Sequence, residues 1–182
     1  RYWRDWSSDV CSSDLMEVED PRRALGRMAA AYRAGFRVPV VAVGGSNGKT
    51  TTKELIGTVL GGCFETLRSP ESYNNDIGVP STLFSLEARH LAAVVEVGTN
   101  HPGELAPLVR MVQPRVGVVT HIGEEHLEHF GSLAGVLEEE GWLPDLLPPD
   151  GVLILPGDAP WTGVLTARTR ARVVRVGEGA GC

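Results

Sequence analysis

The sequence predicts an α/β fold, a three-layer sandwich in which helices cover both faces of a mostly parallel sheet. Short apolar runs alternate with helix-like segments along the chain, which is typical of βαβ units whose strands are buried on both faces. The apolar run at 40–43 opens through a glycine turn into a helix-like segment, as in nucleotide-binding folds. A chain of 182 residues can form one sizeable core.

The first half of the chain predicts five elements. A helix is expected over 20–36, because an Asp-Pro start signal precedes apolar residues at helical spacing. A strand at 40–43 leads into a helix at 50–60, which a pair of glycines ends. A short strand is expected at 64–67. The segment 73–86 begins with polar residues and becomes an amphipathic helix after its proline.

The second half continues the alternation. The near-continuous apolar runs at 91–97 and 115–120 predict buried parallel strands. Between them a helix is expected over 101–112, opened by a proline, and another follows at 133–147. Two more strands are expected at 152–155 and 172–176.

The segment 45–51 predicts a loop that binds nucleotide phosphates. Free backbone N–H groups and the helix dipole favour an anion at such a helix start. Lys49 adds a full positive charge, and the Thr50 hydroxyl is placed for a magnesium ion on the phosphates. Lys49 and Lys53 are the only lysines of the chain, which favours the same role. The nucleotide-binding residues are expected to be Gly45, Ser46, Asn47, Gly48, Lys49, Thr50 and Thr51.

This loop is shorter than the usual eight-residue pattern. Val43 stands where that pattern has its first glycine, which leaves the spacing Gly-x-x-Gly-Lys-Thr. The alternative interpretation is a glycine turn that merely caps a helix.

Two further strand ends carry polar residues at the edge where ligands of parallel sheets bind. Glu96 closes an otherwise apolar run, and a carboxylate there is costly unless it meets a cation or hydrogen bonds. Magnesium suits it beside a phosphate loop, and a solvated acid is the alternative. His126 and Glu128 follow the next strand, as metal ligands or as ordinary polar loop residues.

Composition excludes several classes of protein. A net charge of −6 and a pI near 5.4 argue against a surface for nucleic acid or anionic membrane. The three cysteines are far apart without metal or redox spacing, which favours a reducing compartment. Apolar runs are too short for a membrane span and no apolar signal core is present, so a cytoplasmic protein is expected.

Residues 1–15 resemble the in-frame translation of a sequencing adapter and are excluded from the fold prediction. The alternative is a natural disordered tail. Residues 16–36 are expected to connect from a preceding domain that the chain lacks. Residues 37–182 are expected to form a central domain that is truncated on its C-terminal side.

Five segments together resemble the central ATP-binding domain of the Mur ligase family. The segments are 44–54, 73–84, 94–105, 119–136 and 155–160. The resemblance implies an ATP-dependent amide ligase of cytoplasmic peptidoglycan synthesis. Its substrates would be UDP-N-acetylmuramoyl-tripeptide and D-alanyl-D-alanine, joined through an acyl phosphate by an enzyme that is a monomer at full length.

The resemblance also assigns roles to residues. Lys49 and the loop amides would neutralise charge on the transferring phosphoryl group of ATP. Thr50 and Glu96 would hold one Mg²⁺, and His126 a second ion near the acceptor carboxylate, which makes His126 catalytic together with Lys49. Asn75 and His101 are expected to contact substrate.

One position departs from the family. Family members commonly carry a carbamylated lysine where this chain has Glu140, and no lysine follows Lys53. We expect Glu140 to act as a permanent carboxylate in its place, a catalytic residue for the same ion. The alternative is that Glu140 belongs to a solvated acidic run, 138–140.

Two other functions fit the motifs. Another amide ligase of the family, such as a glutamate-adding enzyme, would keep all the phosphate chemistry. A non-catalytic nucleotide-binding module would keep Lys49 and Thr50 but would have no need of Glu96 and His126.

Overall fold

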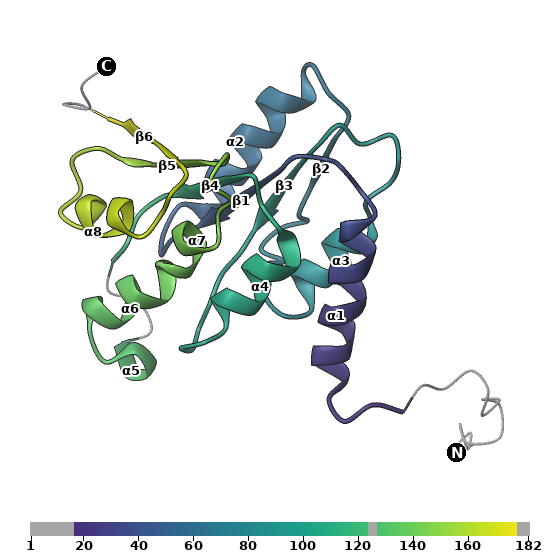
Figure 1. Cartoon of the computed structure of the whole chain (residues 1–182), viewed down its shortest axis with the longest axis horizontal. Coiled ribbons are helices and arrows are strands. Elements are labelled where there is room, and N and C mark those ends of the chain that lie inside the picture. The colour runs from purple at the N-terminus through teal and green to yellow at the C-terminus, as the bar shows by residue number, and fades with distance from the viewer. Residues whose placement is uncertain (1–16, 124–126, 178–182) are drawn as a thin grey trace, which may run out of the picture.

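The computed structural model describes residues 17–123 and 127–177 (Figure 1). Six parallel strands form one sheet in the order β2-β3-β1-β4-β5-β6. The strands are β1 (Val40–Gly44), β2 (Thr66–Arg68), β3 (Ala92–Glu96), β4 (Val116–Val119), β5 (Val152–Pro156) and β6 (Arg172–Val176). The helices are α1 (Pro21–Ala34), α2 (Lys49–Gly61), α3 (Gly78–Phe84), α4 (Leu105–Val112), α5 (Leu127–Phe130), α6 (Leu133–Glu140), α7 (Trp142–Asp145) and α8 (Thr162–Ala167).

Helices cover both faces of this sheet, so the predicted α/β sandwich is confirmed. On one face the larger core joins the strands to buried residues of α1, α3, α4, α6, α7 and α8. On the other face Val43, Val94 and Val118 pack with Ile56 and Leu60 of α2. Figure 1 shows α2 on the opposite side of the sheet from α1, α3 and α4. Apart from Glu96 at the end of β3, the central strands are apolar because both of their faces are covered.

Most expected elements are present. The strand at 172–176 and the central strands lie where the apolar runs predict them, while β2 begins two residues later than expected. Helix α3 begins at Gly78, two residues before the proline from which it was predicted. Pro80 fits there because the first helical turn needs no donor N–H at that position. Helices α5 and α8 were not predicted.

Two helix predictions were wrong in their bounds. The helix expected over 101–112 begins only at Leu105, because Gly103 has φ +88°, a conformation that a right-handed helix excludes. The helix expected over 133–147 is divided at Gly141 into α6 and α7. Pro144 has no N–H to donate to the carbonyl of Glu140 four residues earlier, so a continuous helix would lose that bond.

Candidate functional site

The candidate site lies at the carboxyl ends of the three central strands. Strand β1 pairs with β3 on one side, where Val43 is the register partner of Glu96. It pairs with β4 on the other side, where Gly44 is the partner of Val119. The loops that leave these three strands therefore start from one place, the usual ligand position in parallel sheets.

The loop after β1 takes the shape that its glycines allow. Gly45 and Gly48 have φ of +110° and +83°, and Gly48 is the residue before α2. A Cβ on Gly45 would lie 2.6 Å from the Oγ1 of Thr120, so only glycine fits. The loop is fixed from the β4 side, because Ser46 N donates to the carbonyl of His121 at 2.6 Å and Thr120 Oγ1 donates to that of Asn47 at 2.6 Å.

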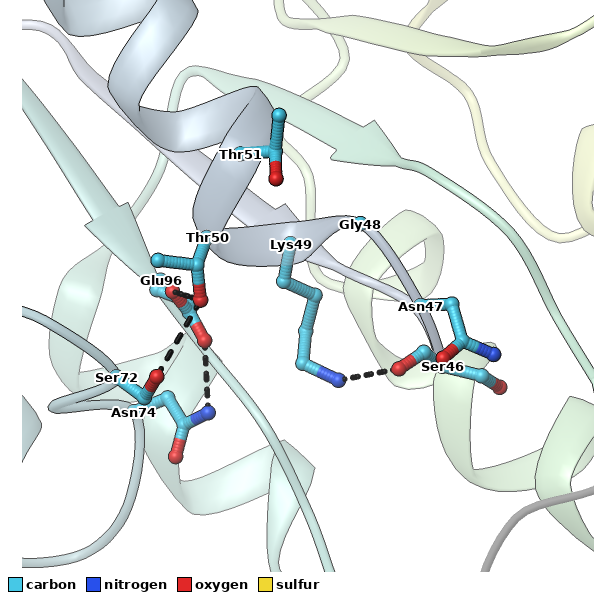
Figure 2. A pocket seen from close by; sticks show the side chains of 9 residues that line it. All are labelled: Ser46, Asn47, Gly48, Lys49, Thr50, Thr51, Ser72, Asn74 and Glu96. Carbon is cyan, nitrogen blue, oxygen red and sulfur yellow. Dashed lines mark hydrogen bonds between the residues drawn. The ribbon is translucent and has the colours of Figure 1, made fainter.

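The side chain of Lys49 folds back over this loop. Its Nζ donates to the carbonyl oxygen of Gly45 at 2.5 Å. It also donates to the carbonyl oxygen of Ser46 at 2.9 Å, as Figure 2 shows. A positive charge is thus held at the N-terminus of α2, where the helix dipole has the same sign. Both features favour a bound anion.

Lys53 does not share this role. Its Nζ is fully buried and donates to the carbonyls of Ser69 at 2.8 Å and Glu71 at 2.6 Å. It also pairs with Glu54 at 2.8 Å, and the hydrogen bond from Lys53 lowers the pKa of that carboxyl. The interpretation of both lysines as phosphate-binding residues is therefore wrong for Lys53, which instead fixes the segment between β2 and α3.

Glu96 is 1% exposed and faces the phosphate loop. Its Oε2 accepts from the Thr50 hydroxyl at 2.9 Å, and its Oε1 accepts from Asn74 Nδ2 at 2.8 Å (Figure 2). Its backbone N–H donates to Ser69 Oγ at 2.9 Å. The carboxylate is therefore on the same side of the sheet as the Lys49 amine, and it is not a solvated strand-end acid.

These groups line one open cavity of about 340 Å³. Its lining residues are Ser46, Asn47, Gly48, Lys49, Thr50, Thr51, Ser72, Asn74 and Glu96. Six of the seven predicted nucleotide-binding residues are among them, and Gly45 is the exception. Sequence reasoning missed Ser72 and Asn74, although both lie in the polar segment before α3.

The donor set of the cavity fits magnesium. Thr50 and Glu96 present a hydroxyl and a carboxylate oxygen within 2.9 Å of each other, and Mg²⁺ prefers such hard oxygen ligands. Among residues 17–123 and 127–177, no group of three His, Cys, Asp or Glu side chains could hold a metal ion. Mg²⁺ is commonly bound by one or two protein oxygens together with nucleotide phosphates, and the Thr50 and Glu96 pair fits that use.

Glu140 approaches the phosphate loop from another element. It is 1% exposed, and its Oε2 accepts from the N–H of Gly45 at 2.9 Å. Its neighbour Glu139 is 5% exposed, whereas the Glu138 side chain is 74% exposed. The interpretation of 138–140 as a solvated acidic run is therefore wrong for two of its three residues.

The two predicted substrate residues lie outside the lining of the cavity. Asn75 Oδ1 accepts from the N–H groups of Ile77 at 3.2 Å and Gly78 at 2.8 Å, so it caps the start of α3. The imidazole of His101 is half exposed and contacts that of His129 at a tilt of 42°, with 4.1 Å between ring centroids. His126 lies outside the described residues.

Glu104 holds the backbone next to His101. Its Oε2 accepts from the N–H groups of Asn100 at 2.8 Å and His101 at 3.1 Å, and its Oε1 lies 3.1 Å from the His101 ring. Burial acts to raise the pKa of Glu104, but these hydrogen bonds together outweigh it and the pKa is lowered.

The comparisons with known proteins agree with this geometry. The family model described as the Mur ligase middle domain matches residues 43–181. The chain belongs to the Mur ligase family.

Several curated Mur ligases are similar in sequence. A UDP-N-acetylmuramoyl-tripeptide–D-alanyl-D-alanine ligase of Escherichia coli is 41% identical over 155 residues, which cover 83% of this chain and 34% of that protein. The ligase of the same name from Bacillus subtilis is 39% identical over 143 residues, which cover 79% of this chain and 31% of that protein. The chain thus spans about a third of the length of these relatives.

Solved Mur ligase structures share the fold. MurF from Acinetobacter baumannii superposes with a TM-score of 0.86 at 37% identity, covering 90% of this chain and 37% of that one. MurF from Thermotoga maritima, solved in complex with ADP, gives a TM-score of 0.86 at 25% identity, covering 94% and 40%. In the part of this Mur ligase domain that the structure describes, no helix is both long and apolar enough to cross a membrane.

Proposed function

We propose that this domain holds the ATP phosphates and Mg²⁺ of a ligase that adds D-alanyl-D-alanine to UDP-N-acetylmuramoyl-tripeptide. One observation carries the nucleotide part of the proposal. The Thr50 hydroxyl and the Glu96 carboxylate meet at 2.9 Å in the cavity that Lys49 also lines. The substrate part is supported by the names of the relatives at 33–41% identity.

The reaction must bring two anions together, the tripeptide carboxylate and the γ-phosphate. At about 4 Å and an effective dielectric near 20, two unit charges repel by roughly 4 kcal/mol. Lys49 and the backbone N–H groups at the start of α2 would offset the charge of the phosphates and keep them in line for transfer. A bound Mg²⁺, held by Thr50 and Glu96, would supply further positive charge at the phosphate oxygens.

Transfer of the γ-phosphoryl group to the tripeptide carboxylate gives an acyl phosphate and ADP. The amine of D-alanyl-D-alanine then attacks the acyl carbon, and phosphate leaves as the amide forms. The role of the chain in both steps is to hold the reacting groups and to exclude other orientations. Glu96 is itself oriented by Asn74, whose amide donates to the carboxylate at 2.8 Å.

The remaining assignments extend the proposal. His126 would hold a second ion near the acceptor carboxylate, and Glu140 would contribute its carboxylate to the same ion. Asn75 and His101 would contact the acceptor. Residues 16–36 would connect from a preceding domain, and 37–182 would be the central domain of a longer cytoplasmic enzyme, which fits the coverage of 31–34% of the relatives' length.

Phosphate release tests the proposal. The protein assayed carries this domain together with the segments that its relatives have outside it. With ATP and Mg²⁺, we expect release with UDP-N-acetylmuramoyl-tripeptide and D-alanyl-D-alanine, and none with D-glutamate or a single diamino acid, each offered with the shorter UDP-N-acetylmuramoyl acceptor that lacks that residue. Release with one of these amino acids instead would assign the domain to a different ligase of the family. Nucleotide binding without release for any amine would indicate a non-catalytic module.

A further inference from the structure

The end of α6 carries two consecutive glutamates that are both buried and serve different loops. Glu139 and Glu140 are 5% and 1% exposed. Successive side chains of a helix point about 100° apart, so neighbours can reach separate partners. Glu140 reaches the loop after β1, where it accepts from Gly45 N at 2.9 Å. Glu139 reaches the loop after β3.

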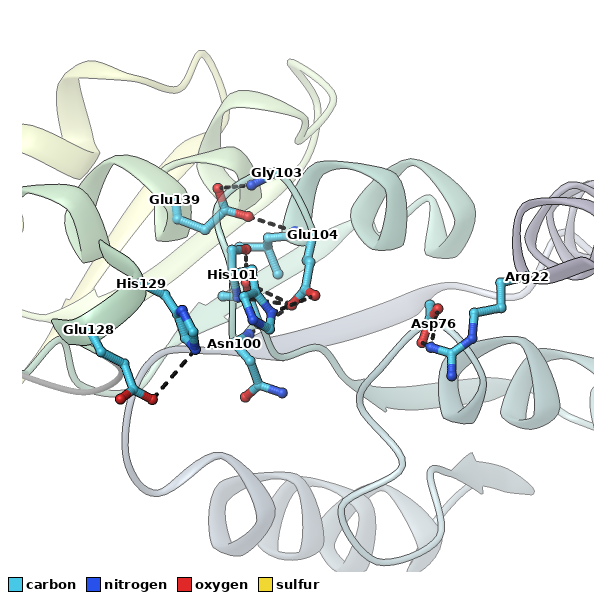
Figure 3. Close-up of polar contacts among 11 residues, drawn as sticks. Arg22, Asp76, Asn100, His101, Gly103, Glu104, Glu128, His129 and Glu139 are labelled. Carbon is cyan, nitrogen blue, oxygen red and sulfur yellow. Dashed lines mark hydrogen bonds and ion pairs between the residues drawn. The ribbon is translucent and has the colours of Figure 1, made fainter. Parts of the chain in front are cut away.

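Glu139 binds the loop after β3 through main-chain atoms. Its Oε2 accepts from the N–H of Gly103 at 2.8 Å, and its Oε1 accepts from the N–H of Leu105 at 2.7 Å (Figure 3). These are charge-assisted bonds at the start of α4, where the helix dipole also favours a carboxylate. The two bonds span Gly103, whose positive φ turns the chain into the helix.

The loop that Glu139 holds, residues 99–104, is the one that carries His101. Inside it, Glu104 accepts from the N–H groups of Asn100 and His101, and the Thr99 hydroxyl donates to the His101 carbonyl at 2.7 Å. These hydrogen bonds brace the loop internally. Glu139 ties it to α6, so the place of His101 depends on a residue that does not touch it.

Together, Glu139 and Glu140 set the distance between the phosphate loop and the 99–104 loop. Strands β1 and β3 are neighbours, so the phosphate loop and the 99–104 loop leave the sheet side by side. Each loop is hydrogen-bonded to one of two adjacent residues on the same helix, α6. A shift of either loop against the other would break at least one of these bonds.

We propose that Glu139 is a positioning residue for the acceptor substrate: it fixes the 99–104 loop at a set distance from the phosphate loop through its neighbour Glu140. The inference rests on the proposed function, in which the loop contacts the acceptor and the phosphate loop holds ATP. Displacement of a substrate-positioning group by about 1 Å can lower the rate up to about 100-fold. Glu139 would thus affect acceptor use without contact with either substrate.

Two variants and a matched control test the inference. Glu139→Gln keeps the size of the side chain but leaves one acceptor oxygen for two N–H donors. Glu139→Asp keeps both oxygens and the charge on a shorter side chain. Glu138→Gln removes a charge from the same turn of α6, where the side chain is 74% exposed and pairs with Arg168 at the surface. Amide hydrogen exchange of Gly103 and Leu105 is measured in the 182-residue chain, and steady-state kinetics in the protein assayed above.

We expect Glu139→Gln to speed exchange of both amides and to raise KM for UDP-N-acetylmuramoyl-tripeptide about tenfold, with KM for ATP within twofold of wild type. Glu139→Asp should also raise KM for the acceptor more than KM for ATP, by a smaller factor. Glu138→Gln should change neither KM value. Unchanged exchange at both amides would overturn the bonds themselves. Faster exchange with an unchanged acceptor KM, or an equal rise in both KM values, would overturn the positioning role.

The two proposals fail in different ways. If the wild-type protein releases no phosphate with these substrates, the proposed function fails, while the exchange measurement still reports on Glu139. If the wild type is active and Glu139→Gln unfolds, Glu139→Asp decides. An acceptor KM for Glu139→Asp equal to that of the wild type would then overturn the inference.

Discussion

The Thr50 hydroxyl donates a 2.9 Å hydrogen bond to the Oε2 of Glu96, which joins the first turn of α2 to the last residue of β3. The other carboxylate oxygen accepts from Asn74, so Glu96 is oriented from two sides. Two hard oxygen ligands are thus placed together, and Mg²⁺ held by them would take further oxygen ligands from the nucleotide phosphates.

Removal of the Thr50 hydroxyl should weaken nucleotide binding only when Mg²⁺ is present. Thr50→Val keeps the shape of the side chain but provides no oxygen ligand, so we expect affinity for an ATP analogue in Mg²⁺ to fall about tenfold. Affinity in EDTA should be unchanged. Titration with a fluorescent analogue measures both, and Thr50→Ser is the control that restores binding. An equal loss in both conditions would contradict the metal role.

The two lysines should behave differently when each is replaced by methionine. Lys53→Met leaves the buried carbonyls of Ser69 and Glu71 without their donor, so we expect a loss of about 3 kcal/mol in the free energy of unfolding. Lys49→Met should change stability by less than about 1 kcal/mol but weaken nucleotide binding at least about tenfold. Urea unfolding and nucleotide titration of both variants check this. A stability loss confined to Lys49→Met would reverse the assignment.

A single methyl group should have opposite effects at two glycines. Gly45→Ala places a Cβ 2.6 Å from Thr120 Oγ1 and 2.7 Å from the His121 carbonyl at φ +110°. We expect it to destabilise the domain by at least about 2 kcal/mol. At Gly163 in α8 a Cβ meets nothing within 4 Å, so Gly163→Ala should stabilise by up to about 1 kcal/mol. Thermal unfolding of the two variants measures the contrast, and a neutral Gly45→Ala would refute the crowding.

Glu140 should influence the metal dependence of turnover if its carboxylate serves an ion. Glu140→Gln keeps an oxygen for the Gly45 N–H but removes the negative charge. We expect the Mg²⁺ concentration for half-maximal turnover to rise several-fold, with the surface variant Glu138→Gln as the control. Turnover measured across a Mg²⁺ titration decides. An unchanged Mg²⁺ dependence would leave Glu140 with only its bond to the loop.

The lowered pKa of Glu104 makes the 99–104 loop sensitive to acid. An unfolded glutamate has a pKa of about 4.3, so the folded state favours the ionised form more than the unfolded state does. The resulting stability is complete above that value and is lost as pH falls through the folded pKa. We expect wild type to exceed Glu104→Gln in unfolding free energy near neutral pH and the two to converge in acid. Urea unfolding from pH 3 to 7 tests this, and a constant difference would contradict it.

Local patterns predicted the centre of this fold because burial on both faces leaves an apolar run. The strand at 91–97 could therefore be predicted from the sequence alone. The phosphate loop from Gly45 to Thr50 could be predicted from the spacing of its glycines and lysine. The division of the predicted 133–147 helix at Gly141 depends on the missing N–H of Pro144. The spacing of apolar residues gives no sign of it. Helix α8 has too few residues for a periodic signal.

Side-chain partners far apart in sequence could not be predicted. The run 138–140 has the composition of a solvated surface, yet Glu139 and Glu140 are buried because backbone N–H groups from two other loops face them. Lys53 has the composition of a phosphate ligand, but it lies one turn beyond Lys49 and points to the segment after β2. Only the assembled sheet brings these partners together. The roles of Asn75, His101 and His126 stay predictions.

The central position of β1 has a consequence for synthesis of the chain. Both of its partners, β3 and β4, are made later, and the β4 pairing closes only when Val119 has left the ribosome. The strand has two unpaired edges until β3 follows and one until β4 follows, and contacts this distant in sequence form slowly. We therefore expect the loop after β1 to reach its final shape only when both neighbouring strands are in place, and the open edge of β1 to favour aggregation until then.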